Sequence, residues 1–237
     1  MTIKKGDFVR LNYTGEIEGR VFDTTDEAIA KENNIRNPEA VYGPFLVRVG
    51  SGHVISGLDE DLEGKEVGVD YTLQVPPEKG FGFRDEGLVE SVSVAKFKET
   101  PELGTRVQVE GREGVVVNRI GRRVIVDFNH PFAGKTLEYR YRIEEQVDSP
   151  VEQIKGLIRL YAQKEMEVEV EGNTARITLS PGVVYDRRWL LWRGRIIDEI
   201  LSFVDGIEHI TLTEHFDRPK VKAGEEESAG KVAAGNE

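Results

Sequence analysis

The chain has 237 residues, of which 38% are hydrophobic and 32% are charged, a composition that suits one large domain or two to three small ones. A formal net charge of −11 argues against a general nucleic-acid-binding surface, although a local basic patch stays open. Because the chain has no cysteine, disulfides, thiol catalysis and cysteine-ligated metals are excluded. No signal-peptide stretch and no apolar run of about 18 residues is found, which predicts a soluble cytoplasmic protein without a membrane partner.

The N-terminal part of the chain is expected to form short strands, a polar loop and one short helix. Apolar and polar residues alternate over residues 3–23, with tight turns between them, which is typical of strands. Residues 24–42 are polar and carry one or two helical turns, so we interpret them as a loop insertion. Ser56 is expected to N-cap a helix over residues 58–62 that ends at Gly64.

Further strands are predicted where short apolar runs end at turn residues, glycine and proline above all. These strands cover residues 45–49, 71–75, 89–94, 105–110, 114–118, 124–128 and 136–144. Four of the runs lie between Gly87 and Phe128, where glycines separate them. This segment is therefore expected to be β-structure throughout.

A domain boundary is predicted at Ser149-Pro150-Val151-Glu152, which has the pattern of a helix capping box with proline at the first helical position. One apolar face follows at helical spacing, formed by Val151, Ile154, Leu157, Ile158 and Tyr161. Residues 165–171 and 175–179 alternate as a hairpin. A second helix near 187–204 and a strand near 208–213 complete a small α+β unit.

The second C-terminal helix carries an unusually wide apolar face. It comprises Trp189, Trp192, Ile196, Ile197, Ile200, Phe203 and Val204, with Leu190 and Leu191 beside it. Most of this face is expected to be domain core, and the remainder to be available to a partner. The prediction is a homodimer formed through this domain. The last residues, 217–237, lack aromatic side chains and are expected to be disordered.

A series of short motifs follows one order along the chain. It consists of Tyr13-Thr14-Gly15, Val21-Phe22-Asp23, Phe45 through Val49-Gly50, Val54-Ile55-Ser56-Gly57-Leu58 and Gly80-Phe81-Gly82. Each motif is unspecific alone, but their order resembles the pattern of FKBP-type peptidyl-prolyl cis-trans isomerases. The run Asn129-His130-Pro131-Phe132-Ala133-Gly134-Lys135-Thr136-Leu137 is similar to the closing motif of the SlyD-like branch of that family.

The resemblance implies a multidomain α+β fold. Residues 1–84 and 130–147 would form the isomerase domain, an FKBP-like antiparallel sheet with a short helix. Residues 85–129 would form an inserted small all-β domain, the so-called IF domain, which binds unfolded chains in that branch. Residues 148–216 would form a C-terminal α+β domain, and this extra domain is similar to that of the long archaeal members. The implied partners are unfolded or extended proline-containing polypeptides.

The implied activity is rotation about X–Pro bonds, which requires no nucleophile, metal or other cofactor. The uncatalysed barrier of about 18–20 kcal/mol comes from the resonance of the planar amide. The twisted amide has lost part of its charge separation, so a dry apolar pocket favours it over the planar form. Each ~1.4 kcal/mol of such preference raises the rate tenfold.

The resemblance places a set of residues around this pocket: Tyr13, Phe22, Asp23, Phe45, Val54, Ile55, Leu58, Phe81 and Tyr139. Four of them would enclose the proline ring, namely Phe22, Phe45, Leu58 and Tyr139. The backbone N–H of Ile55 would hold a substrate carbonyl while the bond turns. Asp23 would either orient Tyr13 or interact with the rotating carbonyl, and the sequence leaves both roles open.

Two of these positions depart from the usual family pattern. Leu58 stands where many members have tryptophan, which gives a smaller pocket floor and agrees with the SlyD-like branch. Phe81 replaces the usual tyrosine and so lacks a hydroxyl that would hydrogen-bond the substrate, a bond worth about 0.5–1.5 kcal/mol. Turnover is therefore expected to be slower or weaker, and not abolished.

Two other functions stay open. A holdase chaperone with little isomerase activity is favoured by the same two departures. An RNA- or ribosome-associated factor is suggested by residues 111–118, which are similar to a short KOW-type motif, and by insert arginines. These are Arg112, Arg119, Arg122 and Arg123. Acidic residues of the insert offset most of this charge, so nucleic acid is the less favoured partner.

Histidine raises the question of a metal site. His53 lies in a glycine-flanked loop, and His130 precedes Pro131 at the return from the insert. Neither has a helical pairing or a carboxylate at ligand spacing in the sequence, so no metal ligand is predicted. The histidine-rich tail that SlyD-like proteins often carry is missing here, and its metal binding is not carried over.

Overall fold

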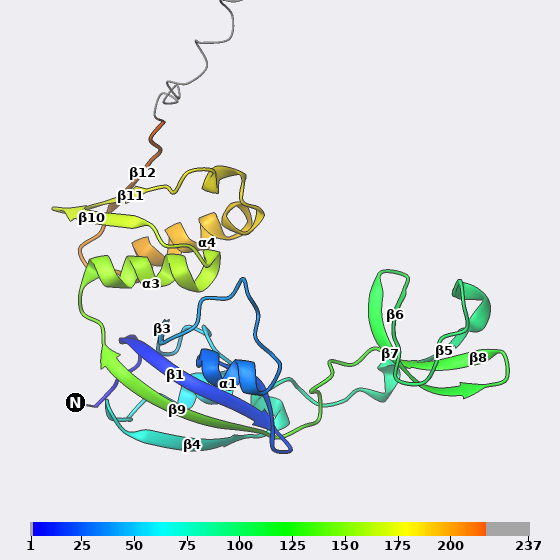
Figure 1. The fold of residues 1–237 in the computed structure, drawn as a ribbon. Coiled ribbons are helices and arrows are strands. Elements are labelled where there is room, and N and C mark those ends of the chain that lie inside the picture. The colour runs from blue at the N-terminus through cyan, green and yellow to red at the C-terminus, as the bar shows by residue number, and fades with distance from the viewer. Residues whose placement is uncertain (1, 217–237) are drawn as a thin grey trace, which may run out of the picture.

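Three sheets and four α-helices make up the computed structural model over the residues that it describes, 2–216 (Figure 1). The strands are β1 (Phe8–Ile17), β2 (Arg20–Thr24), β3 (Phe45–Arg48), β4 (Asp70–Val75), β5 (Val89–Ser93), β6 (Arg106–Val109), β7 (Arg112–Ile120), β8 (Arg123–Asp127), β9 (Leu137–Gln146), β10 (Glu167–Glu171), β11 (Thr174–Thr178) and β12 (His209–Thr213). The helices are α1 (Glu27–Glu32), α2 (Ser56–Asp61), α3 (Pro150–Ala162) and α4 (Arg187–Phe203). The predicted α+β class is confirmed. The predicted disordered tail, residues 217–237, lies outside the described residues.

The N-terminal sheet is arranged around β1, which pairs antiparallel with β9 along one edge. The other edge is shared, because β3 pairs with β1 up to Leu11 and β2 pairs with it from Thr14 onward. In the gap between them, the backbone N–H of Thr25 donates to the carbonyl of Tyr13 at 3.0 Å. The long loop between β2 and β3 therefore leaves and rejoins the sheet on either side of Tyr13. β4 extends the sheet beyond β9.

A first core lies between this sheet and α2. Leu58 of α2 and its C-cap residue Leu62 are fully buried in one cluster with Val9 and Leu11 of β1 and with residues of β3, β4 and β9. The alternation predicted for the strands accounts for this cluster, because every second side chain points to the same face of the sheet. A short helix and strands distant in the sequence are thus joined by one apolar core.

Two predicted helix caps are wrong in detail. Ile55, and not Ser56, is the N-cap residue of α2, and the Ser56 hydroxyl donates instead to the carbonyl of Lys79 at 2.9 Å. Ser149 is at the N-cap of α3 as predicted, but its side chain makes no capping hydrogen bond. For Ser56, a tertiary contact thus overrides the local capping preference.

The insert forms a separate four-stranded sheet with the order β5-β8-β7-β6. Five buried valines make its core: Val92, Val109, Val116, Val124 and Val126. Two chain segments join it to the N-terminal sheet, and Figure 1 shows it standing away from the rest of the molecule. At this junction Arg84 donates to Asp127 (Nη2 to Oδ2, 2.8 Å), and the Asn129 side chain exchanges two hydrogen bonds with the Asp85 backbone, at 2.8 and 2.9 Å.

The C-terminal domain places α3 and α4 between its own sheet and the N-terminal sheet (Figure 1). Its sheet has the order β10-β11-β12, in which β12 runs parallel to β11. The predicted apolar face of α3 is buried at Ile154, Leu157 and Ile158. No helix within residues 2–216 combines the length and the apolar character that crossing a membrane requires.

The C-terminal domain and the N-terminal sheet share one core. Phe8, Leu46 and Val147 of the N-terminal sheet and its exit belong to the same buried cluster as the apolar residues of α3 and α4. The two units pack so closely that a Cβ atom on Gly156 of α3 would lie 2.5 Å from Cβ of Leu46. Glycine at this position is therefore a requirement of the interface, although it weakens the helix itself.

Candidate active site

A cluster of aromatic rings covers the end of the N-terminal sheet where β1, β2 and β9 meet. Phe22 of β2 lies 5.9 Å from Tyr139 of β9, and Tyr139 lies 5.6 Å from Tyr13 of β1, between ring centroids. Tyr13 in turn meets Phe45 of β3 edge-on at 5.6 Å. Rings of four strands therefore form one continuous apolar surface.

Gly15 explains why these rings can meet above β1. It pairs with Asp23 of β2 and with Tyr139 of β9. A Cβ atom at this position would lie 2.9 Å from the Phe22 ring and 3.0 Å from the Tyr139 ring. Any larger residue would push the rings apart, so the glycine of the Tyr-Thr-Gly motif is a packing requirement of the cleft.

The remaining apolar members come from the loop before α2. Val54 and Ile55 are half-buried and pack against the same cluster as the aromatic rings. The carbonyl of Ile55 accepts the backbone N–H groups of Leu58 and Asp59, each at 3.0 Å, which begins α2. The backbone N–H of Ile55 itself donates no hydrogen bond within residues 2–216, so it is free to bind a carbonyl.

Phe22, Phe45, Ile55 and Tyr139 thus belong to one apolar cluster. Leu58 is 1% exposed and Tyr139 is 3% exposed. These two side chains therefore present almost no surface to a substrate, whereas Phe22 and Phe45, the other two residues expected around the proline ring, are half-buried. The structure brings all nine predicted residues into one region, and the catalytic role of each stays a prediction.

Asp23 is the one charged group among the predicted site residues, and it lies exposed at the rim. The phenol of Tyr13 donates to Asp23 Oδ2 at 2.6 Å. Of the two roles left open by the sequence, this contact favours the orientation of Tyr13. Burial, reinforced by the negative charge of Asp23, raises the pKa of Tyr13 well above its usual range. Burial also raises the pKa of Tyr139, with a smaller contribution from Asp23, so both phenols stay protonated.

Phe81 meets two residues that the sequence reasoning left out of the site. Phe132 lies 5.0 Å from Phe22 and 5.3 Å from Phe81, between ring centroids. The ring of His130 stacks on Phe81 at 4.4 Å. Both belong to the Asn-His-Pro-Phe run at the return from the insert, and that motif was the signal that could have placed them here.

A cavity of ≈ 330 Å³ continues from the aromatic cleft toward the C-terminal domain. Tyr13, Asp23 and Phe45 line it on the side of the cleft, and Arg159 and Leu160 of α3 line it on the other. Its wall is fixed by a hydrogen bond in which Arg159 Nη2 donates to the carbonyl of Tyr42 at 2.7 Å. The cleft is therefore bordered by residues of two domains.

The two histidines considered as metal ligands serve other contacts. His53 is buried at the domain interface, where its Nε2 lies 2.9 Å from Oε2 of Glu199. The carboxylate partner that sequence spacing did not reveal is thus supplied by α4. His130 belongs to the aromatic cluster. Within the described residues, no group of three or more potential ligands is placed to hold a metal ion.

Family comparisons cover nearly the whole described chain. The model for the FKBP-type peptidyl-prolyl cis-trans isomerase matches residues 1–99. The FKBP26 IF domain model matches residues 94–132, and the FKBP26 C-terminal model matches residues 150–217. The matches follow each other in the order of the three sheets.

Curated relatives agree with these models. The chain is 38% identical over 146 residues to a short-type peptidyl-prolyl cis-trans isomerase of Methanocaldococcus jannaschii, covering 60% of this chain and 93% of the relative. It is 30% identical over 160 residues to the FKBP-type isomerase SlyD of Haemophilus influenzae, covering 65% and 77% of the two chains. An FKBP-type 16 kDa isomerase of Escherichia coli is 32% identical over 109 residues, covering 43% and 73%. The chain therefore belongs to the FKBP-type peptidyl-prolyl cis-trans isomerase family, in the form that carries the FKBP26 IF and C-terminal domains.

Proposed function

We propose that X–Pro bonds rotate in the aromatic cleft and that the insert holds the client chain during this reaction. The first half is supported by the packing of Phe22, Phe45, Ile55 and Tyr139 in one apolar cluster, in which the rings of Phe22, Tyr139, Tyr13 and Phe45 follow one another. The cleft contains no arrangement for covalent chemistry among its described residues, and rotation needs none, because no bond is broken.

The cleft would lower the barrier by preferring the twisted amide. Water stabilises the polarised planar amide, and a surface of phenylalanine and tyrosine rings excludes water from the bond. The free N–H of Ile55 would hold the peptide by a carbonyl next to the rotating bond. Substrate residues beyond the X–Pro pair would extend into the adjoining cavity, toward Arg159 and Leu160 of α3.

The support for a holding role comes from the edges and exposed apolar residues of the insert. Its outer strands, β5 and β6, each have one unpaired edge, to which an extended peptide can add as a further strand. Leu103 and Ile120 are 66% and 64% exposed on the same domain. A client bound there would have a raised local concentration at the cleft, since one chain links the two sites.

The decisive experiment is a protease-coupled tetrapeptide assay together with a proline-limited refolding assay. Phe22→Ala should reduce kcat/KM in both assays by roughly tenfold or more, which corresponds to ~1.4 kcal/mol of lost preference for the twisted amide. Deletion of residues 85–129 should leave the tetrapeptide rate within about threefold and slow the refolding of protein clients. If neither change slows refolding, the proposal is wrong.

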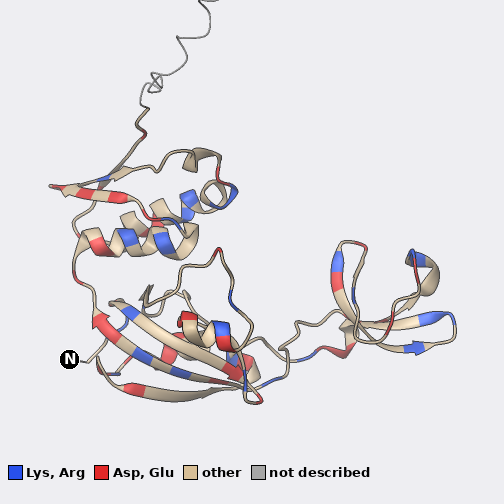
Figure 2. Cartoon of the chain, viewed as in Figure 1, with Lys and Arg blue, Asp and Glu red and all other residues tan. Residues whose placement is uncertain are grey.

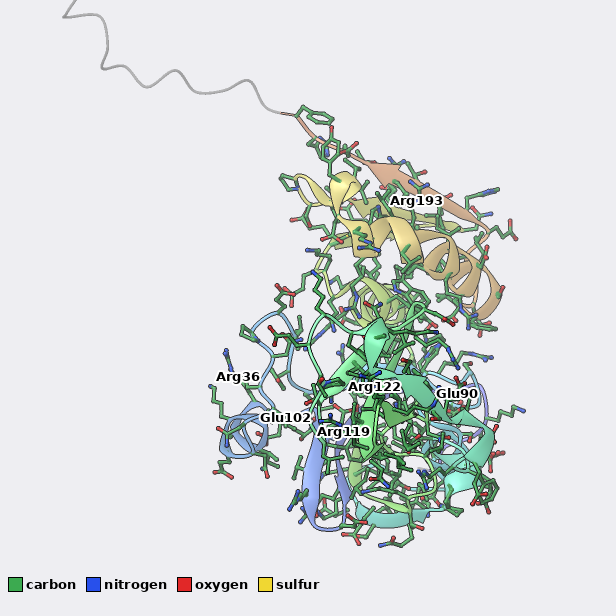
Figure 3. The ribbon with its side chains drawn as sticks, turned by 90° about the vertical axis from the view of Figure 1, so that its right-hand side faces the viewer. Arg36, Glu90, Glu102, Arg119, Arg122 and Arg193 are labelled. Carbon is green, nitrogen blue, oxygen red and sulfur yellow. The ribbon has the colours of Figure 1, made fainter. Side chains whose placement is uncertain are left out.

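The same assays separate the alternatives. Suppressed aggregation without tetrapeptide turnover would establish a holdase. The RNA alternative rests on basic residues near the β7–β8 turn (Figure 2), of which Figure 3 labels Arg119 and Arg122. Within residues 2–216, neither these two arginines nor Arg123 makes an ion pair, unlike Arg112, which pairs with Glu90. RNA binding that weakens with salt, and is lost when these arginines are replaced together, would favour that function.

A homodimer through the C-terminal domain is a further part of the proposal. Leu190 and Leu191 of α4 are 54% and 72% exposed, so the part of the wide apolar face that the core leaves free is available to a second copy. Leu191→Glu should shift the mass measured by sedimentation equilibrium from dimer to monomer. An unchanged mass, or a monomeric wild type, would contradict it. A cytoplasmic location stays a prediction from composition.

A further inference from the structure

The loop of residues 49–55, which we call the cleft loop, is held from two domains. It connects β3 to α2 and ends with Val54 and Ile55, which pack against the same apolar cluster as the aromatic rings. From its own domain, Asp59 of α2 accepts the backbone N–H groups of Gly50 and Gly52 at 2.9 and 2.8 Å. The second attachment is His53, whose side chain is fully buried against the C-terminal domain.

The hydrogen bonds of His53 define its tautomer. Nδ1 accepts the backbone N–H of Arg48 at 3.0 Å, so Nδ1 carries no proton. Nε2 therefore carries the proton and donates to Oε2 of Glu199 at 2.9 Å. The ring also meets Tyr161 of α3 edge-on at 5.8 Å. His53 is thus a directional link from the cleft loop to both helices of the C-terminal domain.

Glu199 is a buried carboxylate, and both of its oxygens accept hydrogen bonds. It is 3% exposed. Its second oxygen accepts the Tyr161 hydroxyl at 2.7 Å and Arg195 Nε at 2.5 Å. A carboxylate is costly to bury, and an apolar side chain would fill the same core without that cost. The carboxylate is therefore best explained by its hydrogen bond to His53, which fixes the orientation of the His53 ring as an apolar side chain could not.

We propose that Glu199 is a positioning residue for the isomerase reaction, acting through His53 on Val54 and Ile55. Two peptide bonds separate His53 from Ile55, whose free N–H would hold the substrate. An error in the position of the loop would move this donor away from the substrate carbonyl. The C-terminal domain would then be part of the catalytic unit, an inference that rests on the proposed role of Ile55.

The test compares two carboxylates that both bridge the domains. Glu152 of α3 accepts Arg10 Nη2 at 2.8 Å across the same interface, but it does not touch the cleft loop. Glu199→Ala and Glu152→Ala are prepared in the full chain, and the tetrapeptide kcat and KM and the amide NMR shifts of Val54 and Ile55 are measured. Glu199→Gln is the conservative variant, because its amide oxygen still accepts from His53 while its NH₂ group can donate to the Tyr161 hydroxyl. Arg195 loses its acceptor in this variant, but its side chain is 55% exposed and can turn to water.

Glu199→Ala is expected to raise KM about fivefold and to shift the Ile55 amide resonance, since a hydrogen bond that orders the substrate donor is lost. Glu199→Gln should restore KM to within about twofold of the wild type, and Glu152→Ala should leave it within the same limit. Equal effects of the two alanine variants, or an unchanged Ile55 resonance in Glu199→Ala, would overturn the proposal.

A second variant covers the case in which Glu199→Ala does not fold. Tyr161→Phe removes one donor to Glu199 and keeps the packing, and it should give a smaller change of KM in the same direction, with the Ile55 resonance again displaced. No change in either quantity would count against the proposal. Failure of the proposed function would give a different result. In that case Phe22→Ala would turn over the tetrapeptide as fast as the wild type, while the Glu199 variants would still shift the Ile55 resonance.

Discussion

The C-terminal domain and the insert are both additions to the same five-stranded sheet, but they join it in different ways. The C-terminal domain shares a continuous core with the sheet, through Phe8, Leu46 and Val147. The insert has a valine core of its own, and within residues 2–216 its hydrogen bonds toward the sheet lie at its two connecting segments. Figure 1 shows the resulting contrast between a packed body and a projecting arm.

This difference separates two ways in which an added domain can serve a catalytic cleft. A domain that shares a core with the cleft can set the position of side chains there, since packed interiors transmit small displacements. A domain on a narrow junction can act only by holding something near the cleft. Substitutions in the two interfaces should therefore have different signatures.

The largest effect is expected for Val126→Asp, which places a carboxylate in the core of the insert. Val126 is fully buried, and an unpaired buried charge costs several kcal/mol, which is comparable to the whole net stability of a domain with a core of five valines. The insert should unfold while the remaining chain keeps its cooperative thermal transition and its tetrapeptide kcat/KM within about twofold. Calorimetry and amide NMR would measure both.

Val117→Asp is the matched control for this experiment. Val117 lies on the adjacent β7 but is 45% exposed, so the carboxylate stays hydrated and the insert should remain folded. If Val126→Asp also lowers the melting temperature of the remaining chain by several degrees, the insert is not the independent arm described above.

The second prediction concerns the shared core. Gly156→Leu should lower the free energy of unfolding by about 1–3 kcal/mol, because the new Cβ atom would lie 2.5 Å from Leu46 Cβ and the helix cannot withdraw without opening the core. A better helix propensity offsets at most about 1 kcal/mol. Tetrapeptide kcat/KM should fall together with stability, as chemical denaturation and kinetics would show.

Gly194→Ala on α4 is the corresponding control, because nothing lies within 4 Å of a Cβ atom there. It should stabilise the chain by up to about 1 kcal/mol and leave turnover unchanged. A Gly156→Leu variant that keeps wild-type stability would show that the two units are less tightly joined than the structure indicates.

The third prediction is a pH dependence from His53. Burial lowers its pKa, and Glu199 opposes this shift only in part. The unfolded chain takes up the proton near pH 6.5 and the folded chain only at lower pH. The contribution of His53 to the free energy of unfolding is therefore fully present above about pH 6.5 and decreases as the pH falls below it. Asp59, Arg48, Tyr161 and Arg195 also face this region.

His53→Gln should remove this slope, which for one proton is at most about 1.4 kcal/mol per pH unit. Urea denaturation between pH 5 and 6.5, above the range in which ordinary carboxylates titrate, would compare the two chains. Equal slopes would indicate that His53 is not the titrating group at the interface.

The smallest effect is expected at the junction of the insert. Arg84 is half-exposed and pairs with Asp127, so Arg84→Ala should cost about 1 kcal/mol or less. Tetrapeptide turnover should not change, while refolding of protein clients should slow, because the arm is less well oriented. Lys96→Ala removes the exposed Lys96–Glu110 pair within the insert and should affect neither assay.

Much of the fold was predictable because its determinants are local. The alternation of β1 and β9, the apolar face of α3 and the turns at glycine each depend on residues within a few positions of one another. The strands predicted in the insert are present, with β7 longer than expected. The cap of α2 was wrong, because the Ser56 hydroxyl found a better partner in Lys79, outside the local window.

The order of the motifs located part of the site, but the contacts of Phe132 and His130 with Phe81 could not be predicted from hydrophobic periodicity. Their rings reach Phe81 only because the chain returns from the insert beside the point where it left. The sequence left two roles open for Asp23, and only the side-chain geometry, in which Tyr13 donates to Asp23, favours the orientation of Tyr13.

The sequence by itself determined most strands and helices, since hydrophobic periodicity and turn chemistry act over short distances. The order of the domains and the apolar residues of the site came from the order of the family motifs. The tertiary structure alone decided that β2 and β3 share one edge of β1, that β12 lies parallel to β11, and that Glu199 meets His53 across 146 residues. The reason is that pairing between distant segments depends on closure of the whole core, which no local pattern specifies.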